Sequence, residues 1–264
     1  MRVFLLPESF KENREFKLSG KDYHYLIRVL RFCEGSMFIG RDGNGNLWDL
    51  LINNVDHKHK ICFLTCKRNK GYTQTGPNIL PSIQTLPELH LYQCILKGKK
   101  LDTLIRQAVE MGISRFIPIQ SAFTVPNLLA KDSQKKLKRW ITIRDEALQQ
   151  SGSSVMTQIS SPISFKQFVS HWNTTALGIF FHHEPLGSFS LKDLISNYKK
   201  KTGSTTFPVA LVIGPEGGFS DSEVTEMKVV GLQPTLLKTN ILRAETAALY
   251  ATACTQMIMS DFDH

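Results

Sequence analysis

Apolar and polar positions follow two different spacings along the chain. In residues 1–70 the apolar positions fall in short runs separated by turn residues, which predict strands over 2–6, 36–40, 47–52 and 61–65. The Asp-Gly and Asn-Gly pairs within Asp42–Asn46 favour a hairpin. One set with the spacing i, i+3, i+4, i+7 predicts a short amphipathic helix: Tyr23, Leu26, Ile27 and Leu30. This region is predicted to be a small β-rich module.

From residue 88 onward, strands and helices are predicted to alternate. Apolar runs predict strands over 89–96, 116–119, 176–181, 207–213 and 235–237. Helical spacing predicts helices over 101–111, 132–150, 188–199, 220–230 and 244–259. Such alternation is typical of an α/β fold in which helices connect parallel strands. Residues 71–87 contain two Gly and three Pro without a period and are predicted to be a linker.

Composition places the chain among folded globular proteins. Its 264 residues are 42% hydrophobic and 21% charged, which suits one or two domains and excludes a disordered or collagen-like chain. No uncharged apolar stretch reaches the roughly 18 residues of a membrane helix, and no apolar run near the N-terminus has the length of a secretory signal. We therefore expect a cytoplasmic protein without membrane spans.

The cysteines agree with this expectation. Five of them, an odd number, are scattered along the chain, which fits a reducing compartment better than a disulfide framework. Cys62 and Cys66 have the spacing of a metal-binding pair, but they lie in an apolar strand-like run, and a structural zinc site usually needs four ligands in recognisable pairs. We expect no metal site.

The net charge of +9 favours a polyanionic partner such as nucleic acid. A basic protein whose lysines serve solubility would have the same total charge. The cluster Lys97-Gly-Lys-Lys100 directly follows a predicted strand and combines basic side chains with a flexible glycine, as a phosphate contact requires. Lysine runs within 131–139 and 199–201 are predicted to be solvated faces that add to the positive field.

The sharpest local pattern is Leu211-Val-Ile-Gly-Pro-Glu-Gly-Gly-Phe-Ser220. A buried strand runs into a turn with three glycines, and a capping box of Ser220 and Glu223 then begins a helix. Glycines at a strand end let a ligand approach the backbone, and open α/β sheets bind ligands beyond the carboxyl ends of their strands. Neither a GxxxxGK[ST] nor a GxGxxG spacing is present, which argues against ATP and NAD. A tight turn without a ligand is the alternative.

Two further polar turns follow predicted strands. Residues 238–247 lead into an alanine-rich helix, where Arg243 and Glu245 either belong to a site or form a local charge pair at a solvated helix start. His182-His-Glu-Pro185 follows the strand over 176–181. Because adjacent side chains point to opposite sides of an extended chain, we expect one exposed and one packed histidine and no joint metal ligation.

Four segments, taken in order, resemble one family. They are Lys97-Gly-Lys-Lys100, Gln107-Ala-Val-Glu-Met-Gly112, Ile213-Gly-Pro-Glu-Gly-Gly-Phe-Ser220 with Glu223, and Ile241-Leu-Arg-Ala-Glu-Thr-Ala247. Together they resemble the bacterial 16S ribosomal RNA uracil-N3 methyltransferases of the trefoil-knotted SPOUT superfamily. The resemblance covers nearly the whole chain, and its most specific part is the combination of Gly-Pro-Glu-Gly-Gly with Leu-Arg-x-Glu-Thr.

This resemblance implies a fold and a cofactor. The expected α/β domain spans 88–264, contains a deep trefoil knot, which is rare among folds, and forms a homodimer through the helix over 244–259. The cofactor would be S-adenosylmethionine, held by the backbone of three loops. The implied cofactor-binding residues are His183, Glu184, Ile213, Gly214, Glu216, Gly217, Gly218, Leu237, Asn240, Ile241 and Leu242. The implied substrate is 16S ribosomal RNA of the small ribosomal subunit.

The resemblance also implies roles in RNA binding and catalysis. Residues 1–70 would form a PUA-like RNA-binding module. The candidate RNA contacts are Arg28, Arg31, Lys97, Lys99, Lys100 and Arg106. Arg243 is expected to stabilise the uracil oxygens or a neighbouring phosphate. Either Glu245 or Glu216 would orient that arginine or relay the N3 proton, and the sequence does not choose between them.

The chain departs from the family pattern at several positions. Lys238-Thr-Asn240 stands where the family has Gly-x-Arg, and Arg106-Gln107 stands where it has Gln-Lys. Ser121-Ala-Phe123 replaces Ser-Glu-Arg, and Gln149-Gln-Ser-Gly-Ser153 replaces Glu-Gln-x-Gly-Arg. Two alternatives therefore stay open: a knotted methyltransferase with another RNA target, and an RNA-binding ribosome-assembly factor without turnover.

Overall fold

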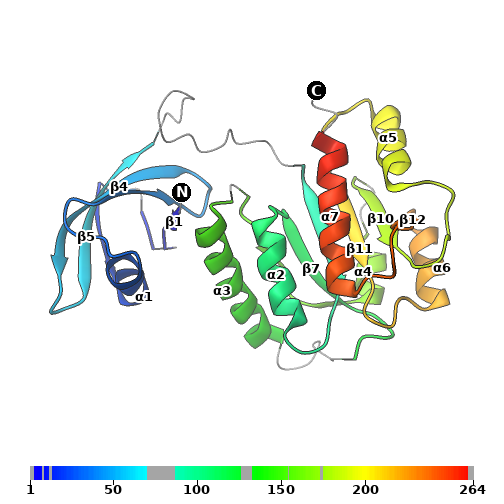
Figure 1. Ribbon diagram of the computed structural model, residues 1–264, viewed down its shortest axis with the longest axis horizontal. Helices are drawn as coiled ribbons and strands as arrows, with labels where there is room; N and C mark the ends of the chain where they lie inside the picture. Colours follow the sequence, from blue (N-terminus) through cyan, green and yellow to red (C-terminus); the bar gives the residue numbers. More distant parts are fainter. Residues whose placement is uncertain are drawn as a thin grey trace. The chain divides into compact units, whose positions relative to one another are not determined.

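The chain forms two compact units, each built on its own sheet (Figure 1). The computed structural model describes residues 3–7, 9–11, 14–69, 87–125, 133–153, 155–172 and 175–260. Unit 1 comprises Met1–Gln84 with Leu148–Met156, and unit 2 comprises Thr85–Ala147 with Thr157–His264. The linker predicted over 71–87 lies outside the described residues except for Pro87.

Unit 1 has a five-stranded sheet in the order β1-β3-β4-β5-β2. The strands are β1 (Phe4–Leu5), β2 (Glu15–Ser19), β3 (Met37–Arg41), β4 (Leu47–Asp56) and β5 (Ile61–Arg68). β1 and β3 are parallel, and the other neighbouring strands are antiparallel. The four predicted strands are confirmed. β2 was not predicted because only two of its five residues, Phe16 and Leu18, are apolar.

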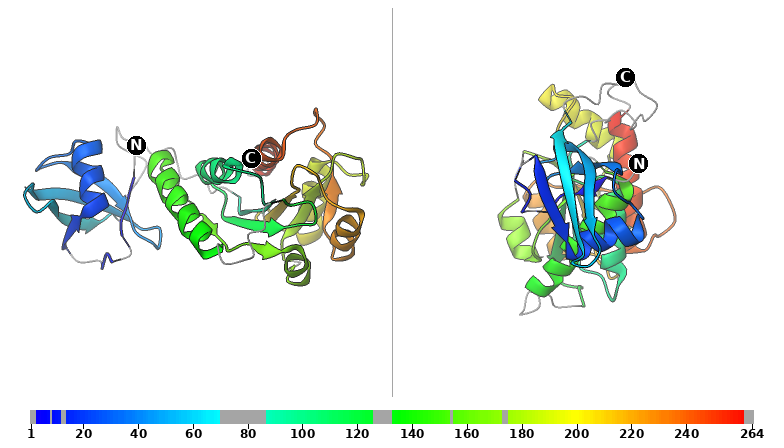
Figure 2. Two further views of the ribbon diagram at one scale, coloured as in Figure 1. Left: turned by 90° about the horizontal axis from the view of Figure 1, so that it is seen from below. Right: turned by 90° about the vertical axis from the view of Figure 1, so that its left-hand side faces the viewer.

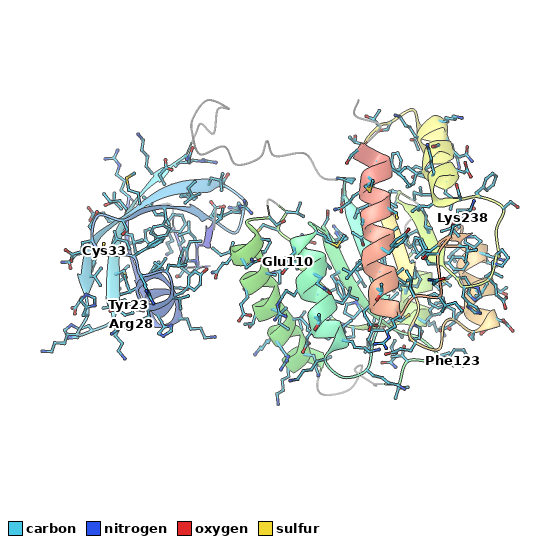
Figure 3. All side chains as sticks on the ribbon, in the orientation of Figure 1. Tyr23, Arg28, Cys33, Glu110, Phe123 and Lys238 are labelled. Carbon is cyan, nitrogen blue, oxygen red and sulfur yellow. The ribbon has the colours of Figure 1, made fainter. Side chains whose placement is uncertain are left out.

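The short helix predicted in unit 1 is present, but most of it is not an α-helix. α1 (Gly20–Tyr23) continues without a break into the π-helix η1 (His24–Val29). The amide of Leu30 donates to the carbonyl of Tyr25, five residues earlier, so the turn is wider than an α-helical one. Leu26 is fully buried on the sheet side, whereas Arg28 is exposed (Figure 3).

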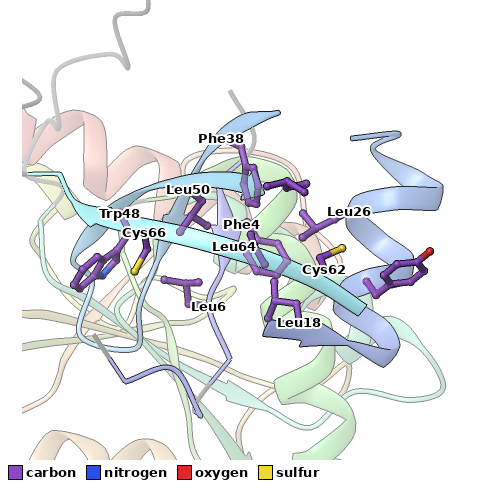
Figure 4. Close-up of a cluster of buried hydrophobic side chains, with 12 residues drawn as sticks. Phe4, Leu6, Leu18, Leu26, Phe38, Trp48, Leu50, Cys62, Leu64 and Cys66 are labelled. Atoms are coloured by element: carbon purple, nitrogen blue, oxygen red, sulfur yellow. The ribbon is translucent and has the colours of Figure 1, made fainter. Parts of the chain in front are cut away.

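The core of unit 1 shows the period of two that the sequence pattern predicts. Trp48, Leu50 and Ile52 of β4 are buried, as are Cys62, Leu64 and Cys66 of β5 (Figure 4). Burial raises the pKa of Cys62 to about 11, and it also raises the pKa of Cys66. These thiols stand four residues apart on one strand, about 13 Å at 3.3 Å per residue. That separation is too large for both to bind one metal ion.

Asp42 organises the predicted hairpin turn between β3 and β4. One of its carboxylate oxygens accepts hydrogen bonds from the amides of Asn44 and Asn46, at 2.9 Å each. The other accepts from Asn46 Nδ2 at 2.9 Å and from Trp48 Nε1 at 3.0 Å. Burial disfavours the charged carboxylate, but these four hydrogen bonds outweigh it and lower the pKa of Asp42.

An Asp42→Ala substitution is expected to lower the free energy of unfolding of unit 1 by about 2–3 kcal/mol, because it leaves the buried Trp48 indole and two amides without an acceptor. Since folding lowers the pKa of Asp42, its contribution is fully present above about pH 4 and declines as the pH falls through the folded-state pKa. Urea titration followed by hydrogen exchange of β3 and β4 measures the difference. Asn44→Ala, at an exposed position of the same turn, should stay within about 0.5 kcal/mol. Equal effects of the two substitutions would contradict this account.

Unit 2 has a seven-stranded sheet in which every pairing is parallel. Its order is β12-β10-β11-β6-β7-β8, and β9 also pairs with β7. The strands are β6 (Leu89–Cys94), β7 (Arg115–Gln120), β8 (Gln158–Ile159), β9 (Ile163–Ser164), β10 (Leu177–Phe181), β11 (Val209–Ile213) and β12 (Gln233–Thr235). All residues of β10 and β11 are buried, as expected for central parallel strands. The α/β fold is confirmed.

Helices cover both faces of this sheet (Figure 2). They are α2 (Lys100–Glu110), α3 (Ser133–Ser151), α4 (Phe165–Ser170), α5 (Leu191–Thr202), α6 (Asp221–Val229) and α7 (Ala244–Ser260). α7 packs against α2, α5 and strands β6 and β11, whereas α4 and α6 pack together on the opposite face. Among the described helices, none is long and apolar enough to cross a membrane.

In unit 2, two predicted boundaries were wrong and three short elements were not predicted. α5 begins at Leu191 and not at 188, because Ser190 forms a capping box with Asp193. β12 covers Gln233–Thr235 and not 235–237. β8, β9 and α4 were not predicted, since two strands of two residues and a helix of six are too short to show a period.

Candidate functional site

A cleft opens at the carboxyl edge of the sheet, where β10, β11 and β12 end side by side. Its volume is about 520 Å³. The lining residues come from three stretches that directly follow these strands: 181–183, 213–219 and 236–247, the last without 238, 245 and 246. This is the position at which open α/β sheets bind ligands.

Glycines give one wall of the cleft its shape. Gly218 has a φ of +73°, and its amide donates to the carbonyl of Pro215 at 2.9 Å, which closes the turn. A Cβ atom at Gly214 would lie 3.2 Å from the Phe219 ring, and one at Gly217 would lie 3.1 Å from Cβ of Phe123. Glycine at these two positions lets Phe219 and Phe123 pack closely against the backbone of the loop. We name 214–218 the glycine loop.

The capping box predicted at the end of this loop is present. The Ser220 hydroxyl accepts from the amide of Glu223, and the Glu223 carboxylate accepts from the amide of Ser220 at 2.9 Å. The second carboxylate oxygen of Glu223, which is almost fully buried, accepts from the amide of Ala122 at 2.8 Å. Glu223 thus joins the glycine loop to the segment after β7, which carries Phe123.

The opposite wall is the turn 236–243 and the first turn of α7. Leu237, Asn240, Ile241, Leu242 and Arg243 line the cleft, and Ile241 is 89% exposed. The Arg243 side chain is exposed, and its carbonyl accepts from the amide of Ala247 in the first turn of α7. The start of α7 therefore fixes the backbone position from which the Arg243 side chain extends into the cleft.

Lys100, at the beginning of α2, connects the two walls. Its ammonium lies 3.3 Å from Glu216 Oε1 in the glycine loop and 3.5 Å from Glu245 Oε1 in α7. Burial opposes the ionisation of Glu216, but the hydrogen bonds from its own amide and from Lys100 outweigh burial and lower its pKa. Glu245 Oε2 is buried and has no hydrogen-bond partner. The cleft therefore has the Glu216 carboxylate on its wall, and the Glu245 carboxylate lies just behind it.

The two histidines after β10 differ in exposure. His182 is half-buried and accepts a hydrogen bond from the amide of Glu184 at 3.1 Å, whereas His183 is exposed. Their ring centroids lie 4.4 Å apart, and the ring planes are tilted by 33°. Burial, with His183 as a further cause, lowers the pKa of His182. Within the described part of the chain, no three His, Cys, Asp or Glu side chains are grouped to hold a metal ion.

Two neighbours of the cleft were missed by sequence reasoning. Gln93, fully buried near the end of β6, donates to the carbonyl of Gly214 at 3.4 Å, and its Oε1 has no partner. Phe123 is 51% exposed and stands beside Gly217, in the part of unit 2 where Figure 3 places it. Because both lie close to the carboxyl ends of strands, the strand-end rule that located the glycine loop also applied to them.

Comparison with known proteins decides the family. Residues 84–256, more than half of the chain, match the RNA methyltransferase domain. This chain belongs to the RNA methyltransferase family. The methyltransferase domain begins where unit 2 begins, and it includes all three stretches that line the cleft.

Relatives of this methyltransferase extend over both units. The ribosomal RNA small subunit methyltransferase E of Synechocystis sp. is 31% identical over 96% of this chain and 76% of its own length. A protein named ribosomal RNA small subunit methyltransferase E 2, from Borreliella burgdorferi, is 30% identical over 92% of this chain and 91% of its own.

Two solved structures share the methyltransferase fold. A ribosomal RNA small subunit methyltransferase E from Neisseria gonorrhoeae, bound to S-adenosyl methionine, covers 98% of both chains with a TM-score of 0.79 and 22% identity. A methyltransferase from Legionella pneumophila, in complex with the same cofactor, covers 97% of this chain and 98% of its own, with a TM-score of 0.76 and 23% identity.

The methyltransferase domain brings most of the predicted site residues together. Of the predicted cofactor-binding residues, all except Glu184 line the cleft, and so does Arg243. Glu245 lies behind the cleft, where Lys100 contacts it. Lys100 itself was predicted to contact RNA, but its ammonium is engaged by two carboxylates. Arg28 and Arg31 are exposed in unit 1.

Proposed function

We propose that this chain methylates N3 of a uridine in 16S ribosomal RNA of the small ribosomal subunit, using S-adenosylmethionine. The observation that carries the proposal is the cleft in which the glycine loop and the turn 236–243 meet beside Arg243. The relatives from Synechocystis and Borreliella are named as methyltransferases of the small-subunit ribosomal RNA. The neighbours from Neisseria and Legionella are bound to S-adenosylmethionine, which supports the same cofactor here.

The residues of the cleft fit this cofactor. A volume of about 520 Å³ is within the range of about 300–1,000 Å³ of small-molecule sites. The glycine loop would hold the cofactor with backbone groups, and Glu216, kept ionised, suits a ligand that carries a positive charge. When bound, S-adenosylmethionine supplies a methyl group on a positively charged sulfur. His183, Leu237 and Asn240 would complete its contacts.

Arg243 and Glu245 are proposed to act on the uracil. The N3 atom of uridine carries a proton, so methylation requires that this proton leave and that the negative charge on the base be stabilised. The Arg243 guanidinium is exposed in the cleft and offers donors to the uracil oxygens. Lys100 contacts both carboxylates, but Glu216 also accepts from the amide of Lys97, whereas Glu245 Oε2 has no hydrogen-bond partner among the described residues. We therefore assign the orientation of Arg243, or the proton relay, to Glu245.

Unit 1 is proposed to be a PUA-like RNA-binding module. Its β-rich fold and the exposed Arg28 and Arg31 support this role. A target base has to be exposed or extruded before an enzyme can act on it. A separate module that holds the RNA would leave the cleft free to receive the base.

The chain after β10 and the chain after β12 are proposed to form the trefoil knot. The loop after β10 lies across β12: Thr235 Oγ1 donates to the carbonyl of Phe189 at 3.1 Å, and a Cβ atom at Gly187 would lie 2.8 Å from the carbonyl of Pro234. The chain then leaves this edge strand and enters α7, which packs against α5, β11 and β6. A trefoil knot requires that one segment of the chain pass through a loop formed by another. The crossing of the loop after β10 over β12 supports such a passage.

α7 is proposed to form the homodimer interface. Thr246, Tyr250 and Met257 are exposed at the spacing i, i+4, i+11, which places them along one side of the helix. Tyr250 is 44% and Met257 is 71% exposed, which leaves apolar surface for a second copy. Mass photometry is expected to return twice the chain mass of 29.9 kDa, and a monomer at working concentrations would contradict the interface.

Mass spectrometry of 16S ribosomal RNA tests the proposed reaction. A strain that lacks the gene is expected to lose one 3-methyluridine, and the wild-type gene is expected to restore it while a gene carrying Arg243→Ala is not. An unchanged methyluridine content in the deletion strain would remove this function. Mapping of nuclease digests identifies a different base or a ribose as target. Calorimetry with S-adenosylmethionine distinguishes an enzyme, which binds the cofactor, from an assembly factor that has lost both cofactor binding and turnover.

A further inference from the structure

A second cleft lies between α2 and the part of α3 that belongs to unit 2, residues 133–147. Its volume is about 400 Å³. The charged residues that line it are Lys99, which is the N-cap of α2, Asp102 and Arg106 from α2, and Arg139 and Glu146 from α3. On each helix these residues are three, four or seven positions apart, so they share the face that is turned toward the other helix. We name this the α2–α3 cleft.

Two cations of the α2–α3 cleft have no partner among the described residues. Asp102 is fully engaged, because Arg139 approaches one carboxylate oxygen at 2.7 Å and Trp140 Nε1 donates to the other at 3.1 Å. Lys99 and Arg106 are both exposed, and neither forms an ion pair or a side-chain hydrogen bond with the other described residues. Glu146, on α3, is the remaining anion of the lining.

Lys99 and Lys100 are consecutive residues at the start of α2, and their side chains face different clefts. Consecutive residues of an α-helix point about 100° apart. Lys100 therefore reaches Glu216 and Glu245 beside the cofactor cleft, while Lys99 lines the α2–α3 cleft. The acidic Glu110 lies at the far end of α2, away from Phe123 and the glycine loop (Figure 3).

Both helices present their basic residues at the same edge of the sheet. α2, α3 and α7 all begin at the edge where the cofactor cleft opens (Figure 1). Lys135 is exposed one turn before Arg139, on the side of α3 that faces α2, and Lys138 is exposed nearby. If one monomer of a polyanion lies in the cofactor cleft, the neighbouring part of that polyanion meets this basic surface where it crosses the first turn of α2.

We propose that the α2–α3 cleft binds a backbone phosphate of the substrate RNA, next to the nucleotide that enters the cofactor cleft. The inference rests on the proposed function for the identity of the polyanion as RNA. Arg106 offers the planar set of donors that matches a phosphate, and Lys99 adds a second positive charge at the end nearest the reaction. Such a contact fixes the position of the strand but carries no sequence preference.

A double variant, Lys99→Ala with Arg106→Ala, tests this site. The dissociation constant for small ribosomal subunits that lack the methyl group should rise about tenfold or more, and the slope of log Kd against log salt should fall by about one or two. The matched control, Lys166→Ala with Lys201→Ala, removes the same charge from exposed positions of α4 and α5 and should change Kd less than about twofold. The affinity for S-adenosylmethionine, measured by calorimetry, should be unchanged in both.

A third variant tests the opposite direction. Glu146→Gln removes the remaining anion from the lining and should tighten RNA binding about two- to fivefold, which a merely damaged fold would not do. If the double variant binds RNA like its control, and Glu146→Gln has no effect, the phosphate site is wrong. If the cleft variants change RNA affinity as expected but no methyluridine depends on the gene, the phosphate site stands and the proposed reaction is wrong.

Discussion

An Arg243→Ala variant is expected to lose about 10²–10³-fold in kcat. Arg243 offers guanidinium donors at the mouth of the cofactor cleft, and the negative charge that appears on the uracil oxygens has no other arginine or lysine in the lining to stabilise it. Because the side chain is exposed, its removal should leave the fold intact. Methylation of small subunits under saturating cofactor measures kcat, and calorimetry measures the affinity for S-adenosylmethionine, which should change less than about threefold.

A second variant at Arg243 separates charge from geometry, and a substitution elsewhere serves as its control. Arg243→Lys keeps the charge without the planar fork and should recover only part of kcat. Arg115→Ala removes an exposed arginine from the start of β7, at the opposite edge of the sheet, and should behave like wild type. A variant at Arg243 that raises KM for the RNA but keeps kcat would mean that this arginine binds the substrate equally in the ground and transition states. It would then contact a phosphate instead of the reacting base.

Gly218→Ala is expected to weaken the binding of S-adenosylmethionine about 5–30-fold. The backbone at Gly218 has a φ of +73°, and a residue with a Cβ atom pays about 1–2 kcal/mol to adopt it, so the glycine loop should relax to another shape. No atom lies within 4 Å of the added Cβ, so the effect comes from the backbone and not from a clash. Calorimetry with the cofactor measures it directly.

The chain contains a matched control for this substitution. Gly203 ends α5 with a φ of +67°, and it also has open space around an added Cβ. Gly203→Ala should therefore lower the free energy of unfolding about as much as Gly218→Ala, by roughly 1 kcal/mol, and leave cofactor binding unchanged. If both variants bind the cofactor like wild type, the shape of the glycine loop does not determine affinity.

The parts that the sequence predicted well are those in which local chemistry decides the structure. β10 and β11 are buried on both faces, so their apolar runs are continuous, and the Ser220 and Glu223 pair marks a helix start through its own hydrogen bonds. The order of the strands along the sheet did not follow from any local pattern. The resemblance to the knotted methyltransferases nevertheless placed the glycine loop and residues 237–242 around one cofactor, and both stretches line the same cleft.

The parts that the sequence did not predict depend on contacts between distant residues. Lys100 is one of three basic residues in a four-residue cluster, and only its distance to Glu216 and Glu245 distinguishes it from Lys99. The π-helical turn at His24–Val29 has the same apolar spacing as an α-helix. The strand-end rule applies to Gln93, but no local pattern indicates that its side chain reaches the carbonyl of Gly214.

Every wall of the cofactor cleft comes from residues beyond position 180, whereas all five strands of unit 1 lie before position 70. Proteins are synthesised from the N-terminus, and domains generally fold as they emerge. A nascent chain would thus have its first sheet complete long before any catalytic pocket exists. A chain whose translation stops before Ala244 would have no α7 to complete the pocket, so, if unit 1 binds RNA as proposed, such a fragment should bind RNA without modifying it.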